Sequence, residues 1–290
     1  MQFLLKKGWY LLISSAFVLP AMAQEPQQYR QEYDAGHWLT QGDAFECRLS
    51  QTLSGVAQGS FVKTPGQPLS LRLQLLSPHN EFNSAHVQIR RADWHEDSMS
   101  GGLDVREQGV VEGDLAHFNA LPTRLLSQIP KGFWLDFIVE VDQQPLQLTF
   151  TSIDSAQALL SYQECLRKMA PLSWEEARNY DVTFETGQRW IRSQQVLNHL
   201  KNLVRYIELD GKVSRVLIDG HTDSVGSAAS NRALSQDRAD EVASRLAEFG
   251  LQSEVMEVRA HGSRYPIASN KSDKQGANRR VQIRLVRDNG

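Results

Sequence analysis

Alternation of apolar and polar residues is the dominant pattern along the chain from residue 38 to about residue 150. It is plainest in 69–75, where four leucines alternate with serine, arginine and glutamine. A period of two places the leucines on one face of an extended segment, so the pattern predicts a half-buried antiparallel strand. Three more segments alternate in the same way and are predicted strands: 86–90, 133–141 and 146–150.

The polar face of these strands decides between two architectures. It carries Ser70, Arg72, Asp136 and Glu140, whereas a barrel that spans an outer membrane needs an apolar outer face. The pattern therefore favours a water-facing β-sandwich or small barrel. Turn-forming residues, such as those at 142–145, separate the strands, and the first half of the chain is predicted to be mostly antiparallel β.

The period changes to three and four residues between Asp154 and Met169. This spacing predicts an amphipathic helix, which ends before Pro171 because proline interrupts the helical hydrogen bonds. The short segment 171–179 is expected to allow some hinge motion between two domains. The apolar positions of the helix are Ala158, Leu159, Tyr162, Cys165 and Leu166.

A second domain, with helices and strands in alternation, begins at about residue 180. The order is β-α-β-α-β-β, and the predicted bounds are 181–184, 188–208, 213–218, 234–249, 257–260 and 280–286. Gly250 stands where the second helix is expected to stop. Such an order builds a sheet with helices packed on it. The predicted fold class is therefore α+β with two domains, an N-terminal mostly antiparallel β domain and a C-terminal α/β sandwich.

The first 23 residues predict a secretory signal peptide. Lys6 and Lys7 precede an apolar run at 9–19, and small residues at 21–23 come before a polar segment. The apolar run is shorter than the about 20 residues that a membrane-spanning helix needs, which argues against an N-terminal membrane anchor. We therefore expect an exported protein with a signal peptide at 1–23, a β-rich domain at 24–170 and a second domain at 171–290.

Cys47 and Cys165 are the only cysteines of the chain. Export places them in an oxidising compartment, where such a pair predicts one disulfide. Two unrelated buried thiols are the alternative. A zinc site would need further cysteine or histidine ligands at suitable spacing, and these are missing.

The distribution of charge along the chain limits the classes of partner that it is expected to bind. The chain has 31 basic and 34 acidic residues, a net charge of −3, and both signs are mixed along its length. A surface for nucleic acid needs a stripe of basic residues, so no nucleic acid is expected among the partners.

Asp223 and Arg238 form the candidate binding pair. Asp223 lies in the loop 220–226 after a predicted strand, and Arg238 follows Ser235, which is the predicted N-cap of the next helix. A helix N-terminus favours an anion, a bidentate arginine favours a carboxylate, and an aspartate holds an ammonium. The pair therefore predicts a receptor for a zwitterionic amino-acid head group. A direct ion pair between Asp223 and Arg238 is the alternative.

Catalysis is not expected. The chain has neither the Gly-x-Ser-x-Gly motif of serine hydrolases nor the His-Glu-x-x-His motif of zinc peptidases. His221, Asp223 and His261 are weighed as metal ligands, but their spacing matches no such motif. We expect no enzyme activity, no metal and no cofactor.

Three motifs of the second half resemble the OmpA-like peptidoglycan-binding family over residues 178–287. They are Gly-His-Thr-Asp at 220–223, Asn-x-x-Leu-Ser-x-x-Arg-Ala at 231–239 and Asn-Arg-Arg-Val-Gln-Ile at 278–283. The resemblance implies an OmpA-like βαβαββ α/β sandwich that captures the diaminopimelate group of the peptidoglycan stem peptide without a covalent bond.

In that family an aspartate binds the ammonium of diaminopimelate and an arginine binds its carboxylate, and these positions match Asp223 and Arg238. Glu185 and Ser263 depart from the aspartate and glutamate that are common in the family. The further positions that the resemblance implies around the pocket are Thr222, Asn231, Leu234, Arg279, Phe184 and Glu185.

The first half adds a second resemblance. Glu-Cys-Arg-Leu at 46–49 and Tyr-Gln-Glu-Cys at 162–165 bracket a β-rich domain that precedes the OmpA-like part. This arrangement is similar to the MotY-type proteins of sodium-driven flagellar motors. It implies a periplasmic protein in a multimeric ring, the T ring, on the flagellar basal body. The implied partners are peptidoglycan, a MotX-like protein and the stator proteins. A general envelope anchor and a wall-modifying enzyme are the alternatives.

Overall fold

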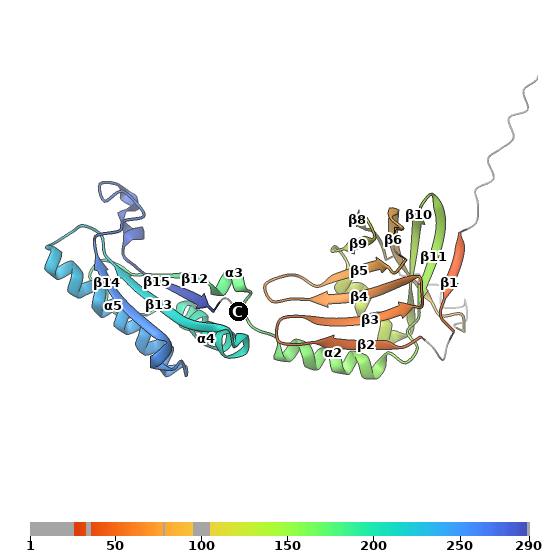
Figure 1. Cartoon of the computed structure of the whole chain (residues 1–290), viewed down its shortest axis with the longest axis horizontal. Helices are drawn as coiled ribbons and strands as arrows, with labels where there is room; N and C mark the ends of the chain where they lie inside the picture. Colours follow the sequence, from red (N-terminus) through yellow and green to blue (C-terminus); the bar gives the residue numbers. More distant parts are fainter. Residues whose placement is uncertain (1–25, 33–35, 78, 95–104, 289–290) are drawn as a thin grey trace, which may run out of the picture.

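Two hydrophobic cores divide the chain into two halves that lie side by side (Figure 1). The computed structural model describes residues 26–32, 36–77, 79–94 and 105–288. The predicted signal peptide lies outside the described residues. Within the described ranges, none of the helices has the length and apolar character to cross a membrane.

The first half contains two sheets. One sheet has the order β1-β11-β10-β6-β7, with β1 (Gln27–Arg30), β6 (Phe82–Arg91), β7 (Arg106–Gln108), β10 (Phe133–Val141) and β11 (Gln144–Phe150). The other has the order β2-β3-β4-β5-β9-β8, with β2 (Trp38–Gly42), β3 (Cys47–Leu53), β4 (Ala57–Lys63), β5 (Ser70–Leu75), β8 (Val110–Glu112) and β9 (Leu115–Phe118). Neighbouring strands run antiparallel except β1 and β11, which are parallel.

The two sheets share one core. Phe118 of β9 and Phe137 of β10 are fully buried, and their rings meet edge to face with centroids 5.4 Å apart. The short helices α1 (Pro122–Leu126) and η1 (Ile129–Lys131) lead into β10, and α2 (Ala156–Lys168) packs beside β2 and β3. The predicted β-rich half, its final helix and the α+β class are confirmed.

The outer face of β10 differs from the prediction that it faces water. Asp136 is 1% exposed. Thr149 Oγ1 donates to it at 2.7 Å, Gln147 Nε2 donates at 3.1 Å, and Arg90 pairs with it at 2.8 Å. Trp134, on the same face, is fully buried beneath the Arg90 guanidinium, 4.5 Å from the ring centroid. Side chains of the neighbouring strands therefore cover this part of the sheet.

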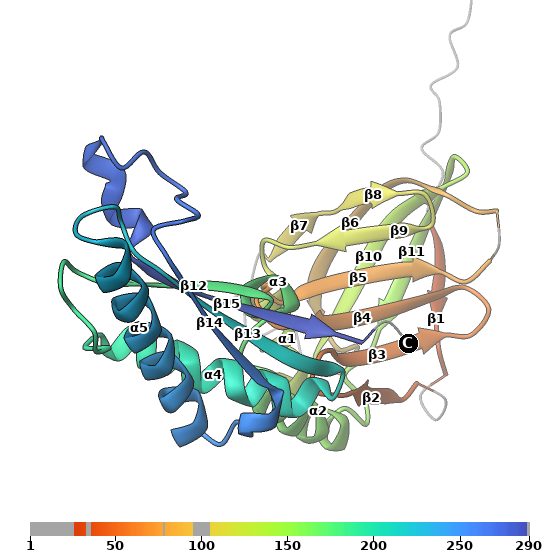
Figure 2. The same ribbon diagram turned by 60° about the vertical axis from the view of Figure 1, so that its left-hand side comes forward.

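The second half is a four-stranded sheet with helices packed on it (Figure 2). The sheet order is β12-β15-β13-β14, in which β13 and β14 are parallel and the other pairs are antiparallel. The elements are α3 (Trp174–Ala177), β12 (Asn179–Thr183), α4 (Gln194–Asp210), β13 (Val213–His221), α5 (Ala228–Glu248), η2 (Ser253–Val255), β14 (Met256–Gly262), η3 (Asp273–Asn278) and β15 (Arg280–Arg287).

Gly220 marks the point where α5 crosses β13. A Cβ atom at this position would lie 2.1 Å from the backbone oxygen of Ser235, so no side chain fits there. This close approach fixes α5 on the face of the sheet where a side chain at position 220 would lie. The flanking residues of β13 face the opposite side, because side chains alternate along a strand.

Both long helices begin at other residues than predicted. Helix α4 begins at Gln194 instead of 188, with Ser193 as its N-cap, and α5 begins at Ala228 instead of about 234, with Ser227 as its N-cap. The first three residues of α5 are exposed. They carry no apolar stripe, and the periodic pattern therefore did not reveal this end of the helix.

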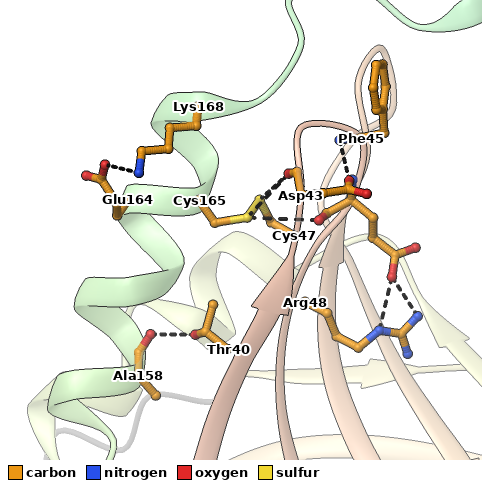
Figure 3. Close-up of a disulfide and its surroundings, with 10 residues drawn as sticks. Thr40, Asp43, Phe45, Cys47, Arg48, Ala158, Glu164, Cys165 and Lys168 are labelled. Atoms are coloured by element: carbon orange, nitrogen blue, oxygen red, sulfur yellow. Dashed lines mark hydrogen bonds and ion pairs between the residues drawn. A yellow bond between two sulfur atoms is a disulfide. The ribbon is translucent and has the colours of Figure 1, made fainter. Parts of the chain in front are cut away.

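The predicted disulfide between Cys47 and Cys165 is confirmed. It joins the start of β3 to the last turn of α2, with 5.9 Å between the two Cα atoms (Figure 3). The bond closes a loop between cysteines that are 118 positions apart in the sequence. A closed loop of that length stabilises the fold chiefly by restricting the unfolded chain.

We predict that reduction lowers the free energy of unfolding by about 4 to 5 kcal/mol, the chain-entropy value for a loop of roughly 100 residues. Thermal melts with and without dithiothreitol measure the effect, and mass spectrometry verifies that the bond is reduced. The double variant Cys47→Ser/Cys165→Ser is the control and should not respond to the reductant. An unchanged melting temperature in fully reduced wild type would contradict the prediction.

Candidate functional site

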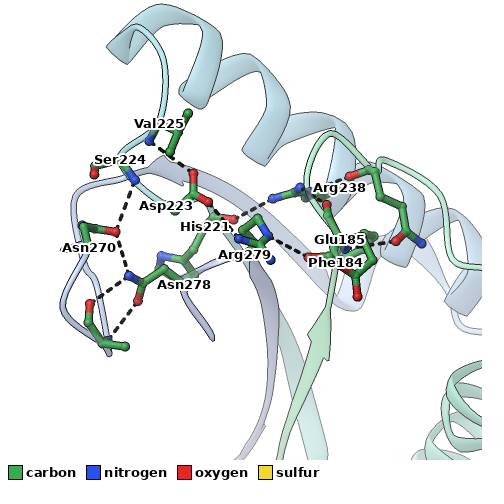
Figure 4. A network of polar contacts seen from close by, with 12 residues as sticks. Phe184, Glu185, His221, Asp223, Ser224, Val225, Arg238, Asn270, Asn278 and Arg279 are labelled. Atoms are coloured by element: carbon green, nitrogen blue, oxygen red, sulfur yellow. Dashed lines mark hydrogen bonds and ion pairs between the residues drawn. The ribbon is translucent and has the colours of Figure 1, made fainter. Parts of the chain in front are cut away.

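Asp223 lies in the loop between β13 and α5, next to the start of β15 (Figure 4). It is 7% exposed. Its Oδ2 atom accepts a hydrogen bond from Arg279 Nη1 at 3.0 Å, and its Oδ1 atom accepts one from the backbone N–H of Val225 at 3.2 Å. Both carboxylate oxygens therefore already have a donor.

Arg238 is fully buried on α5. Its guanidinium donates to three backbone carbonyls: Nε to Gln188 at 2.8 Å, Nη2 to Glu185 at 3.2 Å and Nη1 to His221 at 3.4 Å. The guanidinium carbon also lies 5.1 Å from the centroid of the Phe184 ring. Burial and the charge of a neighbouring arginine lower the pKa of Arg238 to about 10, so the group stays protonated at neutral pH.

The position of Arg238 corrects the predicted reason for anion binding. Ser235 is not an N-cap, because α5 already begins at Ala228, and Arg238 stands in the interior of the helix. The Ser235 hydroxyl instead donates to the carbonyl of Arg232 at 2.8 Å and accepts from the N–H of Gly262 at 3.0 Å. The dipole of the helix N-terminus therefore does not act on this arginine.

Arg279 connects the two sides of the site. Its Nε donates to the carbonyl of Phe184 at 3.1 Å, and its own carbonyl accepts from the N–H of the same residue at 2.9 Å. Because Arg279 also donates to Asp223, the ion pair of the site is Asp223–Arg279 and not the Asp223–Arg238 pair weighed as the alternative. Two guanidinium groups and one carboxylate leave a net charge of +1, which favours an anionic ligand group.

Five of the eight predicted binding residues meet in this network: Asp223, Arg238, Arg279, Phe184 and Glu185. Glu185 contributes its backbone carbonyl, and its side chain is exposed. Thr222 is 2% exposed, and its hydroxyl has no partner among the described residues. Asn231 is buried on α5 and Leu234 is half-buried there, and the described contacts do not connect either side chain to the network.

Three residues of the site were not among the predicted ones. Gln188 supplies a carbonyl to Arg238, and its Oε1 atom accepts from the N–H of Glu185 at 3.0 Å. Asn278 is fully buried and donates to Asn270 Oδ1 at 2.8 Å, and the same oxygen accepts from the N–H of Ser224. Asn278 stands in a quoted motif, whereas Gln188 and Asn270 carried no signal in the sequence.

Asp219 organises the face of the sheet opposite α5. It is 3% exposed and receives two hydrogen bonds of 2.6 Å from Arg259 and one of 2.9 Å from Arg284, while His261 Nε2 lies 2.7 Å from its Oδ1 atom. Burial alone would raise the pKa of Asp219. The hydrogen bonds from Arg259, His261 and Arg284 outweigh burial and hold this pKa well below its ordinary range. The strand that leads to Asp223 is thereby fixed to its neighbours.

His221 lies at the end of that strand and is 5% exposed. Its ring stacks on His261 at 4.9 Å and meets Tyr265 edge to face at 6.5 Å. Burial, and then the charge of Arg280, lower the pKa of His221 to about 4. The side chain is therefore neutral at physiological pH.

We predict that the free energy of unfolding of the second half decreases as the pH falls from 6.5 towards about 4. In this window the unfolded chain protonates His221 and the folded chain does not, so acid favours unfolding. Urea denaturation across the window measures the slope. The variant His221→Gln keeps the carboxylates and should show a flatter slope, whereas a slope equal to that of wild type would contradict the prediction.

Comparison with known proteins covers both halves of the chain. The sequence model of the MotY N-terminal domain matches residues 29–171, and that of the OmpA family matches residues 183–280. The sodium-type flagellar protein MotY of Vibrio parahaemolyticus is 22% identical over 99% of this chain and 98% of its own length. Outer membrane protein A of Bordetella avium is 30% identical over 47% of this chain and 70% of its own length. The crystal structure of the peptidoglycan-associated lipoprotein from Burkholderia pseudomallei is 27% identical, covers 37% of this chain and 89% of that chain, and has a TM-score of 0.35.

Proposed function

This chain belongs to the OmpA family, as a MotY-type protein with a C-terminal OmpA domain, and we propose that it holds flagellar stator units to the peptidoglycan wall. Both resemblances seen in the sequence motifs are confirmed by this membership. The proposed location is the periplasm, and the proposed role is structural, without catalysis.

The observation that carries the proposal is the network of Asp223, Arg279 and Arg238. The head group of diaminopimelate bears an ammonium and a carboxylate on one carbon atom. Asp223 offers a carboxylate to the ammonium. Arg238 has five N–H donors, of which three reach backbone carbonyls, and the other two are the proposed donors to the ligand carboxylate.

Access to this pocket requires a local movement. Arg238 is fully buried, and Asp223 is occupied by Arg279. The segment 185–190 covers Arg238 with two backbone carbonyls. We infer that this segment shifts when the stem peptide enters, and that the ligand ammonium takes over part of the contact between Asp223 and Arg279.

The first half is proposed to assemble on the flagellar basal body, in a multimeric ring with a MotX-like partner and the stator proteins. Its support is the match to the MotY N-terminal domain and the similarity to a flagellar protein along the whole chain. A general envelope anchor is the rival function. The observation in its favour is that a relative such as outer membrane protein A of Bordetella avium matches only 47% of this chain.

We predict that Asp223→Asn weakens binding to purified sacculi by about 10- to 150-fold, the loss expected when a charge-assisted contact of roughly 1.5 to 3 kcal/mol is removed. Arg238→Lys should weaken binding similarly, because lysine keeps the charge but lacks the planar fork of donors. Co-sedimentation with sacculi measures the affinity, and thermal melts verify that each variant is folded.

The matched control is Glu248→Gln. Glu248 lies on α5 like Arg238, but it is 54% exposed and pairs with Arg245 at the C-terminal end of the helix. This control should bind sacculi like wild type. If Asp223→Asn and Arg238→Lys also bind like wild type, the assignment of the pocket is wrong.

A deletion strain tests the motor role separately. We predict that the strain still builds flagella but loses swimming and the stator units around the basal body, because the first half no longer holds them there. Motility in soft agar and fluorescence of labelled stators measure the two effects. Normal swimming with stators in place would refute the flagellar role and leave the wall-binding role standing.

A further inference from the structure

Phe45 belongs to the first half in sequence but packs with the core of the second half. It stands at the tip of the hairpin between β2 and β3 (Figure 3). Its ring meets the ring of Tyr206 on α4 edge to face, with centroids 5.5 Å apart. Tyr206 is fully buried, and Phe45 is itself one of the partly buried side chains that pack against the second core.

The receiving side is a connected group of aromatic and charged side chains. The Trp174 ring lies 6.4 Å from the Tyr206 ring, and the Arg287 guanidinium lies 3.8 Å above the Trp174 ring. Arg287 also donates to the Tyr206 hydroxyl at 2.6 Å and pairs with Asp210 at 2.5 Å. These contacts join α3, α4 and the end of β15, so the surface that receives Phe45 is held together by residues of the second half.

The hairpin tip that carries Phe45 is equally constrained. The Asp43 carboxylate accepts hydrogen bonds from the N–H groups of Phe45 and Glu46, at 2.7 and 3.0 Å. Directly behind the tip, Cys47 is bonded to Cys165 of α2. A tip held in this way transmits force with little local bending.

The backbone that links the two halves forms a hydrogen bond to the same hairpin tip. The N–H of Ala170 donates to the carbonyl of Ala44 at 2.8 Å. After it, Leu172 and Ala177 are buried in the second core. The segment 171–179, which the sequence predicts as a hinge, is thus largely occupied by structure of the second half.

A second contact lies at the turn between β4 and β5. Gly66 has a φ of +73°, and a Cβ atom there would lie 2.7 Å from Glu176 Oε2 and 3.1 Å from Ser173. Ser173 and Glu176 form the capping box at the start of α3. Two separate contacts restrict twisting as well as bending between the halves, which one contact could not do.

The two halves do not meet along a continuous surface. A cleft of about 590 Å³ lies beside the Phe45 contact, with Asp43 and Lys168 on one side and Arg205 and Leu209 on the other. Among the described residues before Ala170, Phe45 alone packs against the second hydrophobic core.

We propose that Phe45 is a positioning residue that locks the two halves into one rigid body, with the Cys47–Cys165 bond holding the tip in place. A tether with a hinge would let the wall-binding domain rotate freely relative to the domain that meets the motor. With Phe45 seated against Tyr206, force applied to one half moves the other directly. The rigidity is a property of the chain itself, and only its use in the motor rests on the proposed function.

The variant Phe45→Ala tests the lock in the full chain. Nuclear spin relaxation of backbone amides should give one rotational correlation time for both halves of wild type and two shorter, different times for the variant. Trypsin cleavage after Lys168, which is 71% exposed, should accelerate by roughly tenfold, since loss of the contact raises the population of open states. Equal tumbling and equal cleavage in variant and wild type would overturn the proposal.

Leu39→Ala is the matched control, because Leu39 lies on the same hairpin but is 59% exposed. It should behave like wild type in both measurements. Circular dichroism and an intact disulfide verify folding, and Phe45→Gln is a second variant that removes the aromatic contact with a smaller loss of volume. Uncoupling by Leu39→Ala as well would also count against a specific role for Phe45.

Sacculus binding separates this inference from the proposed function. Phe45 lies outside the Asp223–Arg238 pocket, so Phe45→Ala should bind sacculi like wild type while swimming speed under load decreases. If the relaxation data show uncoupling but motility is unchanged, the lock exists and its role in the motor is refuted. If tumbling is unchanged, the lock itself is refuted, whatever the sacculus binding.

Discussion

The buried guanidinium of Arg238 is the constraint around which the second half is arranged. A charged group can be taken out of water only if its donors find partners, and three backbone carbonyls from two segments satisfy this need. The segment after β12 and the end of β13 must therefore converge on α5. The same convergence brings Arg279 against Asp223. The buried charges of Arg238 and Asp223 and the partly buried charge of Arg279 thus define the position of the pocket. They also make the pocket suitable for a ligand that carries both a negative and a positive group.

A second set of contacts connects the half that contains this pocket to the first half of the chain. The disulfide restricts the hairpin between β2 and β3, and the hairpin carries Phe45 to the core of the second half. A wall anchor works only if it resists displacement, so a rigid connection between the two halves suits the proposed role. Each half has its own cluster of buried side chains, and Phe45 of the first half packs against the cluster of the second.

Much of the fold could be predicted because its signals are local. The leucines of β5 alternate in the sequence as they do in the sheet, and the disulfide follows from two cysteines in an exported chain. The start of α5 was missed because its first residues are exposed and carry no apolar stripe. Asp136 was expected in water, yet side chains from neighbouring strands cover it, and a pattern within one strand does not reveal such cover.

The residues of the candidate site could likewise be predicted only in part from the sequence. The motifs predicted that Asp223 and Arg238 belong to one site, and both lie in one network of contacts. The partners of Arg238 are backbone carbonyls, which every residue possesses and no motif displays. The contact of Phe45 with Tyr206 joins positions that are 161 residues apart (206 − 45). A lone aromatic residue in a polar turn gives no sign of such a partner.

Calorimetric titration of the full chain with two soluble stem peptides tests the central claim most directly. One peptide carries diaminopimelate at its third position, and the other carries lysine, which has the same side-chain amine but lacks the adjacent carboxylate. A pocket that pairs Asp223 with an ammonium and Arg238 with a carboxylate predicts binding of the diaminopimelate peptide and a loss of at least about tenfold in affinity for the lysine peptide. Equal affinity for the two peptides would contradict the account.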